Sequence, residues 1–348
     1  MHSAQRGDLG QAVAVRSVLH LTNGDSAVRP IEELGIGGEV IPWRDVLHDG
    51  PVPPNLSLRD LSRVRAEYLA SEGFGNAADL AQEFADRDAA IARATDHDLV
   101  VLWFEWDLCD QLQLIQILDQ LASIDDEELR EAGTSLEMVS VAGYLGATAY
   151  DRFPVLWEER EPVTREMLDT GRVAWGAVRS SDPSAVAELM ETGTESLPFL
   201  AGALERFLEE LPSAENGLSR CEQQLLEAIA GRPRSFTEAF QIAARREERV
   251  FCGDASAARY FERLGSGEEP LVLFPTGERV RAPRREADSA AFRNTEISLT
   301  EAGRAVLSGE RDWIEMGGAD RWLGGMHLEG RHAAWRWDRD RRSLVFAE

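Results

Sequence analysis

The stretch that decides the fold is DLVVLWFEWDLCDQLQLIQIL, residues 98–118. Its first part, Asp98–Phe104, is the strongest apolar run in the chain and predicts a buried β-strand. Its second part has the apolar periodicity of a helix, which we expect over Asp110–Leu121. A buried strand that leads directly into a helix is typical of a parallel sheet covered on both faces.

Similar patterns lie on both sides of this stretch. We expect further strands at Ser17–Thr22, Gly37–Pro42 and Leu136–Ala142, and helices over residues 58–72 and 77–94. Strands that alternate with helices predict an α/β fold. The sequence therefore predicts a parallel-sheet domain over residues 16–150 that carries the ligand site.

Two further regions follow this domain. Residues 151–212 are helical in pattern and punctuated by prolines, which predicts a helical connector. Residues 213–348 predict a winged-helix-like α+β domain, and the boundary lies within the sequence LPSAENGL at 211–218. This domain is expected to contain three short helices, strands at 271–274, 278–281 and 295–299, and a terminal β-hairpin over 335–346.

Composition excludes several classes of function. The chain has 348 residues, a net charge of −25 and no lysine, so that all 37 basic residues are arginines. A P-loop lysine, a kinase strand lysine and a Schiff base with pyridoxal phosphate are therefore excluded. Because affinity for nucleic acid comes from basic side chains that neutralise phosphates, nucleic acid is not an expected partner.

Targeting and redox signals are weak. No apolar run approaches the roughly 18 residues that a membrane span needs, and Met1–Gln11 read as a polar, disordered tail without a secretory signal. Cys109, Cys221 and Cys252 are far apart and odd in number, which suits a reducing compartment. We therefore expect a cytoplasmic protein that does not bind membranes.

Polar side chains gather in the loops that leave the carboxyl ends of the predicted strands. In a parallel sheet these loops share one edge, where ligands bind. The expected catalytic residues are Asp25, Ser26, Asp45 and His48, and the expected ligand-binding residues are Gly24, Asp107, Asp110, Gln111 and Tyr144.

Two motifs at this edge suggest chemistry. Gly24, Asp25 and Ser26 lie where a strand becomes a helix, so their backbone amides could hold an anion; the alternative is that Asp25 or Ser26 caps the helix. Imidazole titrates near neutrality, and Asp45 could orient His48 as a general base. The alternative is that Asp45 holds the turn and His48 is an ordinary exposed histidine.

Three acidic residues follow the central strand. Glu105, Asp107 and Asp110 offer hard oxygen ligands that suit magnesium or a polyhydroxylated or cationic ligand. The alternative for Asp110 is a capping box with Gln113. No metal-ligand set is assigned from the sequence, and the cofactor is unknown.

Arginines gather in the C-terminal region. Arg259 and Arg263 lie on the helix that would be a recognition helix, and four more arginines lie on or beside the predicted wing, at positions 279, 281, 284 and 285. Acidic residues interrupt this cluster. A role in protein interaction or packing is therefore the alternative to nucleic-acid binding.

These motifs resemble a known family. HLTNGDS (20–26), WRDVLHDGP (43–51) and DQLQL (110–114) resemble the bacterial family catalogued as domain of unknown function 1835, over residues 17–146. The block around residues 299–325 is similar to a second domain that accompanies it. The resemblance implies the domain division and the choice of sheet edge, but no reaction. Gly-Asp-Ser is also similar to the GDSL hydrolases, in which this serine is the nucleophile.

Two functions follow as hypotheses. In the first, the N-terminal domain binds, and transforms, a small polar or phosphate-bearing metabolite, and the C-terminal domain is a lid or a dimerisation element in a homodimer. In the second, the protein is a non-catalytic ligand-sensing regulator or adaptor that acts through its winged-helix-like domain. The sequence contains no complete catalytic signature, so whether the protein is an enzyme stays open.

Overall fold

The computed structural model describes residues 17–318 and 320–346; the predicted tail, Met1–Gln11, lies outside the described residues. The N-terminal region alternates strands and helices as predicted. Its elements are β1 (Val18–Thr22), α1 (Val28–Glu32), β2 (Glu39–Pro42), α2 (Leu58–Ser71), α3 (Ala77–Ala92), β3 (Leu99–Glu105), α4 (Leu108–Leu121), α5 (Asp126–Ala132) and β4 (Ser135–Val141).

The strands of this region form one sheet in the order β2-β1-β3-β4-β5. β1 pairs in parallel with both β2 and β3, and β3 pairs in parallel with β4. The short β5 (Glu161–Pro162) runs antiparallel to β4 at the edge of the sheet. The prediction of an α/β fold with parallel strands is confirmed.

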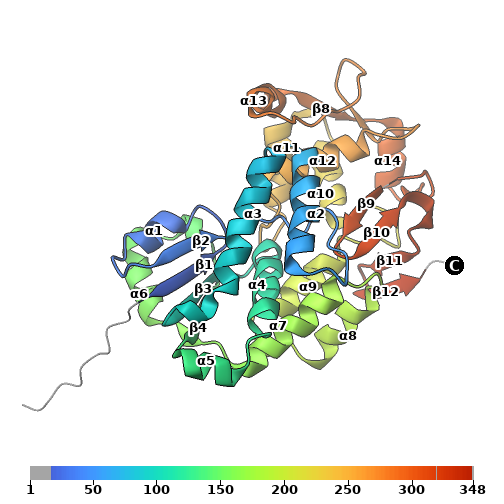
Figure 1. Cartoon of the computed structure of the whole chain (residues 1–348). Coiled ribbons are helices and arrows are strands. Elements are labelled where there is room, and N and C mark those ends of the chain that lie inside the picture. The colour runs from blue at the N-terminus through green and yellow to red at the C-terminus, as the bar shows by residue number, and fades with distance from the viewer. Residues whose placement is uncertain (1–16, 319, 347–348) are drawn as a thin grey trace, which may run out of the picture.

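Side chains alternate between the two faces of β3, and both faces are buried. Val101 and Trp103 pack on one face against α1 and α6 (Phe153–Glu158), and Val100 and Leu102 pack on the other in the core that contains α4. In Figure 1 the sheet lies between these layers. Every residue of β3 is buried, which explains its continuous apolar sequence.

The region after residue 151 first supplies α6 and β5 to the N-terminal sheet and then forms three helices beside α4. Its main helices are α7 (Arg165–Val178), α8 (Ser184–Thr192) and α9 (Leu200–Leu208). α7 and α9 both contact α4 (Figure 1). The buried side chains of these helices join those of α4 in one hydrophobic cluster, so the helices are part of the protein core.

The C-terminal region combines short helices with small antiparallel sheets. It contains α10 (Arg220–Ile229), β6 (Arg234–Ser235), α11 (Phe236–Ala244), α12 (Asp254–Leu264), β7 (Val272–Leu273), α13 (Glu286–Asn294), β8 (Glu296–Leu299) and α14 (Glu301–Leu307). Two hairpins follow, formed by β9 (Asp320–Leu323) with β10 (Met326–Glu329), and by β11 (Trp335–Asp338) with β12 (Ser343–Phe346).

One strand predicted in this region is wrong. Residues 278–281 form no strand; the backbone N–H of Phe274 donates to the carbonyl of Glu278 at 2.9 Å, so the chain turns there. β6 pairs with β8 instead, which gives the order β6-β8-β7. The glycine and charged residues between 275 and 279 favour a turn over a longer strand.

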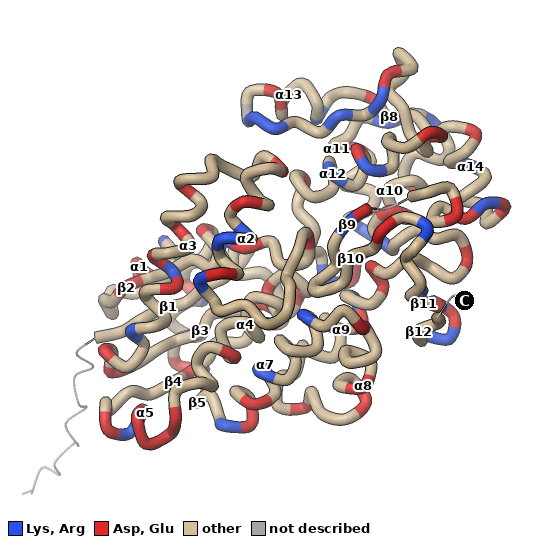
Figure 2. Tube along the Cα trace, turned by 45° about the vertical axis from the view of Figure 1, so that its right-hand side comes forward, with Lys and Arg blue, Asp and Glu red and all other residues tan. Residues whose placement is uncertain are grey.

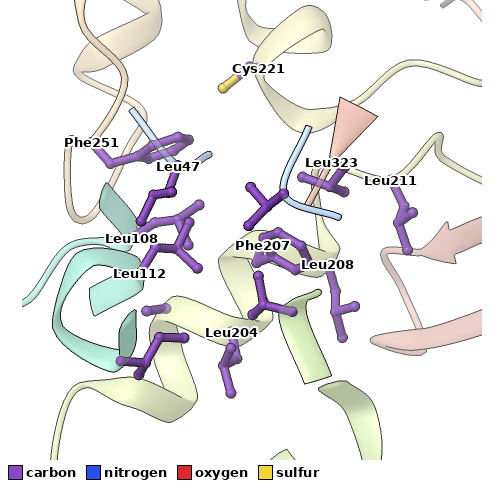
Figure 3. Close-up of a cluster of buried hydrophobic side chains, with 14 of the residues drawn as sticks. Leu47, Leu108, Leu112, Leu204, Phe207, Leu208, Leu211, Cys221, Phe251 and Leu323 are labelled. Atoms are coloured by element: carbon purple, nitrogen blue, oxygen red, sulfur yellow. The ribbon is translucent and has the colours of Figure 1, made fainter. Parts of the chain in front are cut away.

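The three sequence regions share one hydrophobic core. Figure 3 shows Leu108 of α4, Phe207 of α9 and Leu323 of β9 in the same cluster, together with Leu47 and Phe251 from loops. The exposed fraction of each is 8% or less. Because residues from all three regions bury one another, they should unfold together.

The helices are short. The longest in the described residues, α3, has 16 residues. None of the described helices has both the length and the apolar composition that a bilayer span needs.

Replacing Phe207 by alanine should destabilise the whole protein. The side chain is 0% exposed, so its loss leaves a cavity that costs about 3–5 kcal/mol of unfolding free energy. Urea unfolding should still show one transition, at lower urea. Val173→Ala, at a position on α7 that is 54% exposed, should change stability by less than about 0.5 kcal/mol. Two separate transitions in Phe207→Ala would contradict the shared core.

Candidate functional site

Three carboxylates meet just beyond the carboxyl end of β3. Glu105 ends β3, and Asp107 and Asp110 lie at the start of α4. One oxygen from each lies within 4.8 Å of the others, and the residues are 4%, 3% and 4% exposed. Carboxylates are seldom buried in this way because like charges repel strongly in a low dielectric. We call these three residues the acidic cluster.

The acidic cluster lies where ligands bind in open parallel sheets. β1 and β3 are neighbours, and the helices that follow them, α1 and α4, pack on opposite faces. This arrangement leaves a crevice between the two loops. Asn23, after β1, donates its Nδ2–H to Asp110 Oδ2 at 2.7 Å, and the backbone N–H of Leu145, after β4, donates to Glu105 Oε1 at 2.5 Å.

Local hydrogen bonds explain why the chain turns here. Asp107 caps α4, since its Oδ1 accepts the backbone N–H of Cys109 at 2.9 Å. Asp110 Oδ1 accepts the backbone N–H of Glu105 at 2.9 Å, and Gln111 Nε2 donates to the carbonyl of Glu105 at 2.6 Å. The cap is therefore Asp107, and the capping box considered for Asp110 is not formed.

Burial shifts the titration of all three acids. Loss of hydration raises the pKa of Glu105 to about 7 and that of Asp107 to about 6. The pKa of Asp110 also rises, because it is buried and because Asp107 and Glu105 repel its negative charge. Near neutral pH the acidic cluster holds protons or needs a cation.

His48 lies within electrostatic reach of the acidic cluster. Its charge lowers the pKa of Asp107, opposing the larger effect of burial. The ring is 2% exposed and packs edge-on against Phe251, with centroids 5.0 Å apart. Among the described residues, neither ring nitrogen has a partner in full hydrogen-bond geometry, although the ring lies close enough to the Cys252 thiol to act on it. His48 also contributes, after Cys221, to lowering the pKa of Cys252 to about 7.

Gly24, Asp25 and Ser26 lie in the loop between β1 and α1, at the same edge of the sheet as the acidic cluster. Asp25 is exposed, and its carboxylate accepts three hydrogen bonds from Arg44, at 2.9, 3.1 and 2.6 Å. In the described chain neither Asp25 nor Ser26 caps α1, whose N-cap position is Ala27. Ser26 lies beside Gly146, where an added Cβ would be 2.9 Å from the Ser26 Cβ. Asp25 is therefore engaged with Arg44 and is not part of the acidic cluster.

Asp45 is buried in an ion pair with Arg65. Its Oδ1 accepts hydrogen bonds from Arg65 Nε and Nη2 at 3.0 and 2.9 Å, and Arg87 lies 3.7 Å from Oδ2. Arg65 also donates to the carbonyls of Val46, Asp49 and Pro51. Asp45 makes no hydrogen bond to His48, so the alternative that Asp45 holds the turn describes the structure. Asp45 and Arg65 instead hold the loop that carries His48.

A segment from the C-terminal region covers this edge. The backbone N–H of Val250 donates to the Tyr144 hydroxyl at 2.5 Å. Arg249 Nη1 donates to the carbonyl of Trp106 at 3.2 Å, and its guanidinium lies 5.0 Å from the Trp106 ring centroid. Tyr144 therefore links the loop after β4 to residues 247–253, which we call the covering segment.

The two arginines considered for nucleic-acid contact are packed inside the protein. Arg259 is 3% exposed and lies 3.3 Å from Glu72, the residue that follows α2. The side chain of Arg263 is 19% exposed and lies 3.8 Å from Asp49. This face of α12 is therefore turned toward the N-terminal region.

No family model matches the chain, and no curated protein matches it either. The resemblance drawn from the motifs therefore stays a prediction.

Sequence reasoning did not select every group at the site. Asn23 bonds directly to Asp110 but was not among the predicted site residues. Glu105, whose pKa is raised, was considered as an oxygen ligand but was not assigned as a binding residue. Asn23 precedes Gly24 at the end of a strand, which was an available signal. The covering segment lies more than 100 residues away in sequence and carries no such signal.

Asp45→Asn should destabilise the protein. Removing the charge leaves Arg65 buried without its counter-ion, which costs about 3 kcal/mol of unfolding free energy. Asp25→Asn is the matched control: Asp25 pairs with Arg44 at the surface, so its loss should cost less than about 1 kcal/mol. Chemical denaturation of both variants measures the difference. Equal stability of the two variants would contradict a structural role for Asp45.

Proposed function

We propose that this protein binds a small polar metabolite, bearing phosphate or several hydroxyl groups, through a divalent cation held by the acidic cluster. The observation that carries the proposal is the meeting of three buried carboxylates, with oxygens within 4.8 Å, at the switch point of a parallel sheet. Carboxylate oxygens are the ligands that magnesium, manganese and calcium prefer.

Electrostatics supports a cation. Glu105, Asp107 and Asp110 have raised pKa values because their charges are buried and repel one another. A divalent cation would remove this cost by pairing with the charged forms. It would also present open coordination positions to phosphate or hydroxyl oxygens of a ligand, as magnesium does with substrate phosphates.

His48 is the group that could add chemistry to binding. It is buried without a partner in full hydrogen-bond geometry among the described residues, and its charge acts on Asp107. A cation in the acidic cluster would acidify a bound water or hydroxyl group, and His48 in its neutral form would take the proton released and become the charged form that acts on Asp107. The proposed enzymatic form of the function is therefore metal-assisted proton transfer.

The second candidate is a ligand-sensing regulator, and the covering segment favours it. Val250 and Arg249 contact the loops after β4 and β3, so a ligand here would act directly on the C-terminal region. We propose that the elements from α10 to β8, in the order helix, strand, helix, helix, strand and strand with α13 inserted, form a winged-helix-like unit. The three unpaired thiols support a reducing, cytoplasmic setting.

Divalent cations should stabilise the wild-type protein and not Asp107→Asn. Asparagine keeps the helix cap but removes one charged ligand from the acidic cluster. At a cation concentration about 100 times its Kd, the wild type should gain about 2.7 kcal/mol, measured by thermal unfolding in magnesium, manganese or calcium. Asp25→Asn should keep the full response. If cations also stabilise Asp107→Asn, the cation site is not the acidic cluster. If cations do not stabilise the wild type, the result favours the ligand-sensing regulator.

Without a cation, the acidic cluster should make stability fall as pH rises. Because burial raises the pKa of Glu105 from 4.5 to about 7, the folded protein holds a proton that the unfolded chain releases. Stability from this group is therefore present below about pH 4.5 and is lost as pH rises toward about 7.

Glu105→Gln tests this dependence because glutamine keeps an acceptor for Leu145 but has no charge to bury. In chelator, the variant should gain about 1–3 kcal/mol relative to the wild type between about pH 5 and about pH 8. Urea unfolding at both pH values measures the gain. A difference between the two proteins that does not change with pH would contradict the raised pKa.

A further inference from the structure

Two cysteines line one small pocket at the covering segment. Cys221 lies in the first turn of α10, and Cys252 belongs to the covering segment. Both line a pocket with a volume of about 20 Å³, and both lie in or against the same hydrophobic core. Figure 3 shows Cys221 in the same cluster as Phe251, the residue that precedes Cys252. The fold therefore brings together two thiols that are far apart in sequence.

The two thiols interact directly. A hydrogen bond between their side chains is the largest cause that raises the pKa of Cys221 and lowers the pKa of Cys252 to about 7. Cys252 is therefore the thiol that loses its proton more readily, and Cys221 is the thiol that keeps it. The thiolate is the nucleophilic form of cysteine, so Cys252 is the reactive member of the pair.

Two further side chains complete the surroundings of the pair. Arg206 Nη2 donates to Cys221 Sγ at 3.2 Å. His48 is 2% exposed, has no partner in full hydrogen-bond geometry among the described residues, and lies close enough to the Cys252 thiol to act on it. A neutral imidazole beside a thiol can take its proton, which is how cysteine nucleophiles are activated. The pair thus has a proton acceptor on one side and a cationic donor on the other.

We propose that Cys221 and Cys252 are a site of reversible oxidation, which forms a disulfide when the protein meets a peroxide. The Cys252 thiolate attacks one oxygen of hydrogen peroxide and the O–O bond breaks. Cys252 becomes a sulfenic acid, and the hydroxide that leaves takes up the proton released by Cys252 to form water. Cys221 Sγ then attacks the Cys252 sulfur, so that the S–S bond forms and the S–O bond breaks. The sulfenic hydroxyl group leaves with the Cys221 proton as a second water.

The pocket favours a small, uncharged oxidant. Its volume exceeds the roughly 10–15 Å³ that one water molecule needs, but it has no room for a peptide disulfide such as glutathione disulfide. Among the described residues that line it, Glu247 alone carries a charge. The chain has 62 acidic and 37 basic residues, spread along the whole trace (Figure 2), so the protein as a whole repels anionic oxidants. Hydrogen peroxide is both small and neutral.

The disulfide would tie the covering segment to α10. Cys252 follows Val250, whose backbone N–H donates to the Tyr144 hydroxyl, so a covalent bond at Cys252 would hold that contact in place. In a reducing compartment such a disulfide is transient, and its formation reports exposure to an oxidant. The oxidation itself does not depend on the proposed function of the acidic cluster.

Treatment of the full, reduced chain with hydrogen peroxide, followed by mass spectrometry, tests the proposal. The wild type should lose about 2 Da, the mass of two hydrogens, and dithiothreitol should reverse the loss. A digest should contain a peptide that links Cys221 to Cys252. Cys252→Ser should form no disulfide. Cys221→Ser should stop at the Cys252 sulfenic acid, which adds about 16 Da and is trapped by dimedone.

Cys109→Ser is the matched control and should form the disulfide like the wild type. Burial and the nearby carboxylates of Asp107 and Asp110 raise the pKa of Cys109, so this thiol should take no part in the reaction. A disulfide that includes Cys109, oxidation of single cysteines without a linked peptide, or a link that forms only between two chains would overturn the proposal. If Cys221→Ser does not fold, the linked peptide of the wild type and its loss in Cys252→Ser decide.

Hydrogen exchange tests the effect on the covering segment. The amide of Val250 should exchange at least about fivefold more slowly in the oxidised protein than in the reduced protein, because the segment opens less often. Equal exchange rates would overturn the proposed tie between the covering segment and α10. Asp107→Asn should form the disulfide whether or not it responds to cations, so the two proposals fail or hold separately.

Discussion

Complete burial of β3 is the constraint on which the rest of the structure depends. A strand whose seven residues are all buried must have layers on both faces and strands on both edges. It therefore lies at the centre of the sheet between β1 and β4. Acidic residues begin at the last position of β3. Glu105, Asp107 and Asp110 therefore lie close together, beneath the loops of the neighbouring strands.

The C-terminal region completes this edge and does not form a separate body. Arg206 of α9 pairs with Glu210 at 2.8 Å, and Glu210 accepts a hydrogen bond from the Tyr260 hydroxyl at 2.9 Å. These buried groups connect the helical connector to α12, from which the covering segment extends back to Tyr144. Ion pairs and hydrophobic packing therefore both link α9 to α12. Parts of the chain that are distant in sequence enclose the acidic cluster.

Local patterns predicted the N-terminal sheet well because each of its four parallel strands has its own apolar run. The predicted strand at Asp98–Phe104 corresponds to β3, and Asp107 and Asp110 lie together at the end of that strand. Pairing partners could not be predicted. Asp45 was expected beside His48 but is bound to Arg65, whose position 20 residues later depends on how α2 packs. The same holds for Arg259, which a helical pattern leaves exposed and the tertiary fold buries.

The covering segment has a kinetic consequence. The hydrogen bond from Val250 to Tyr144 and the contact of Arg249 with Trp106 lie over loops that surround groups less than 5% exposed. If the acidic cluster binds an ion as proposed, the ion would have to enter when the segment opens locally, and such openings are rare compared with diffusional encounters. The rate at which the ion enters and leaves the acidic cluster would then be set by the opening of the covering segment. The bound ion would stay in place through brief changes in the ion concentration of the solvent.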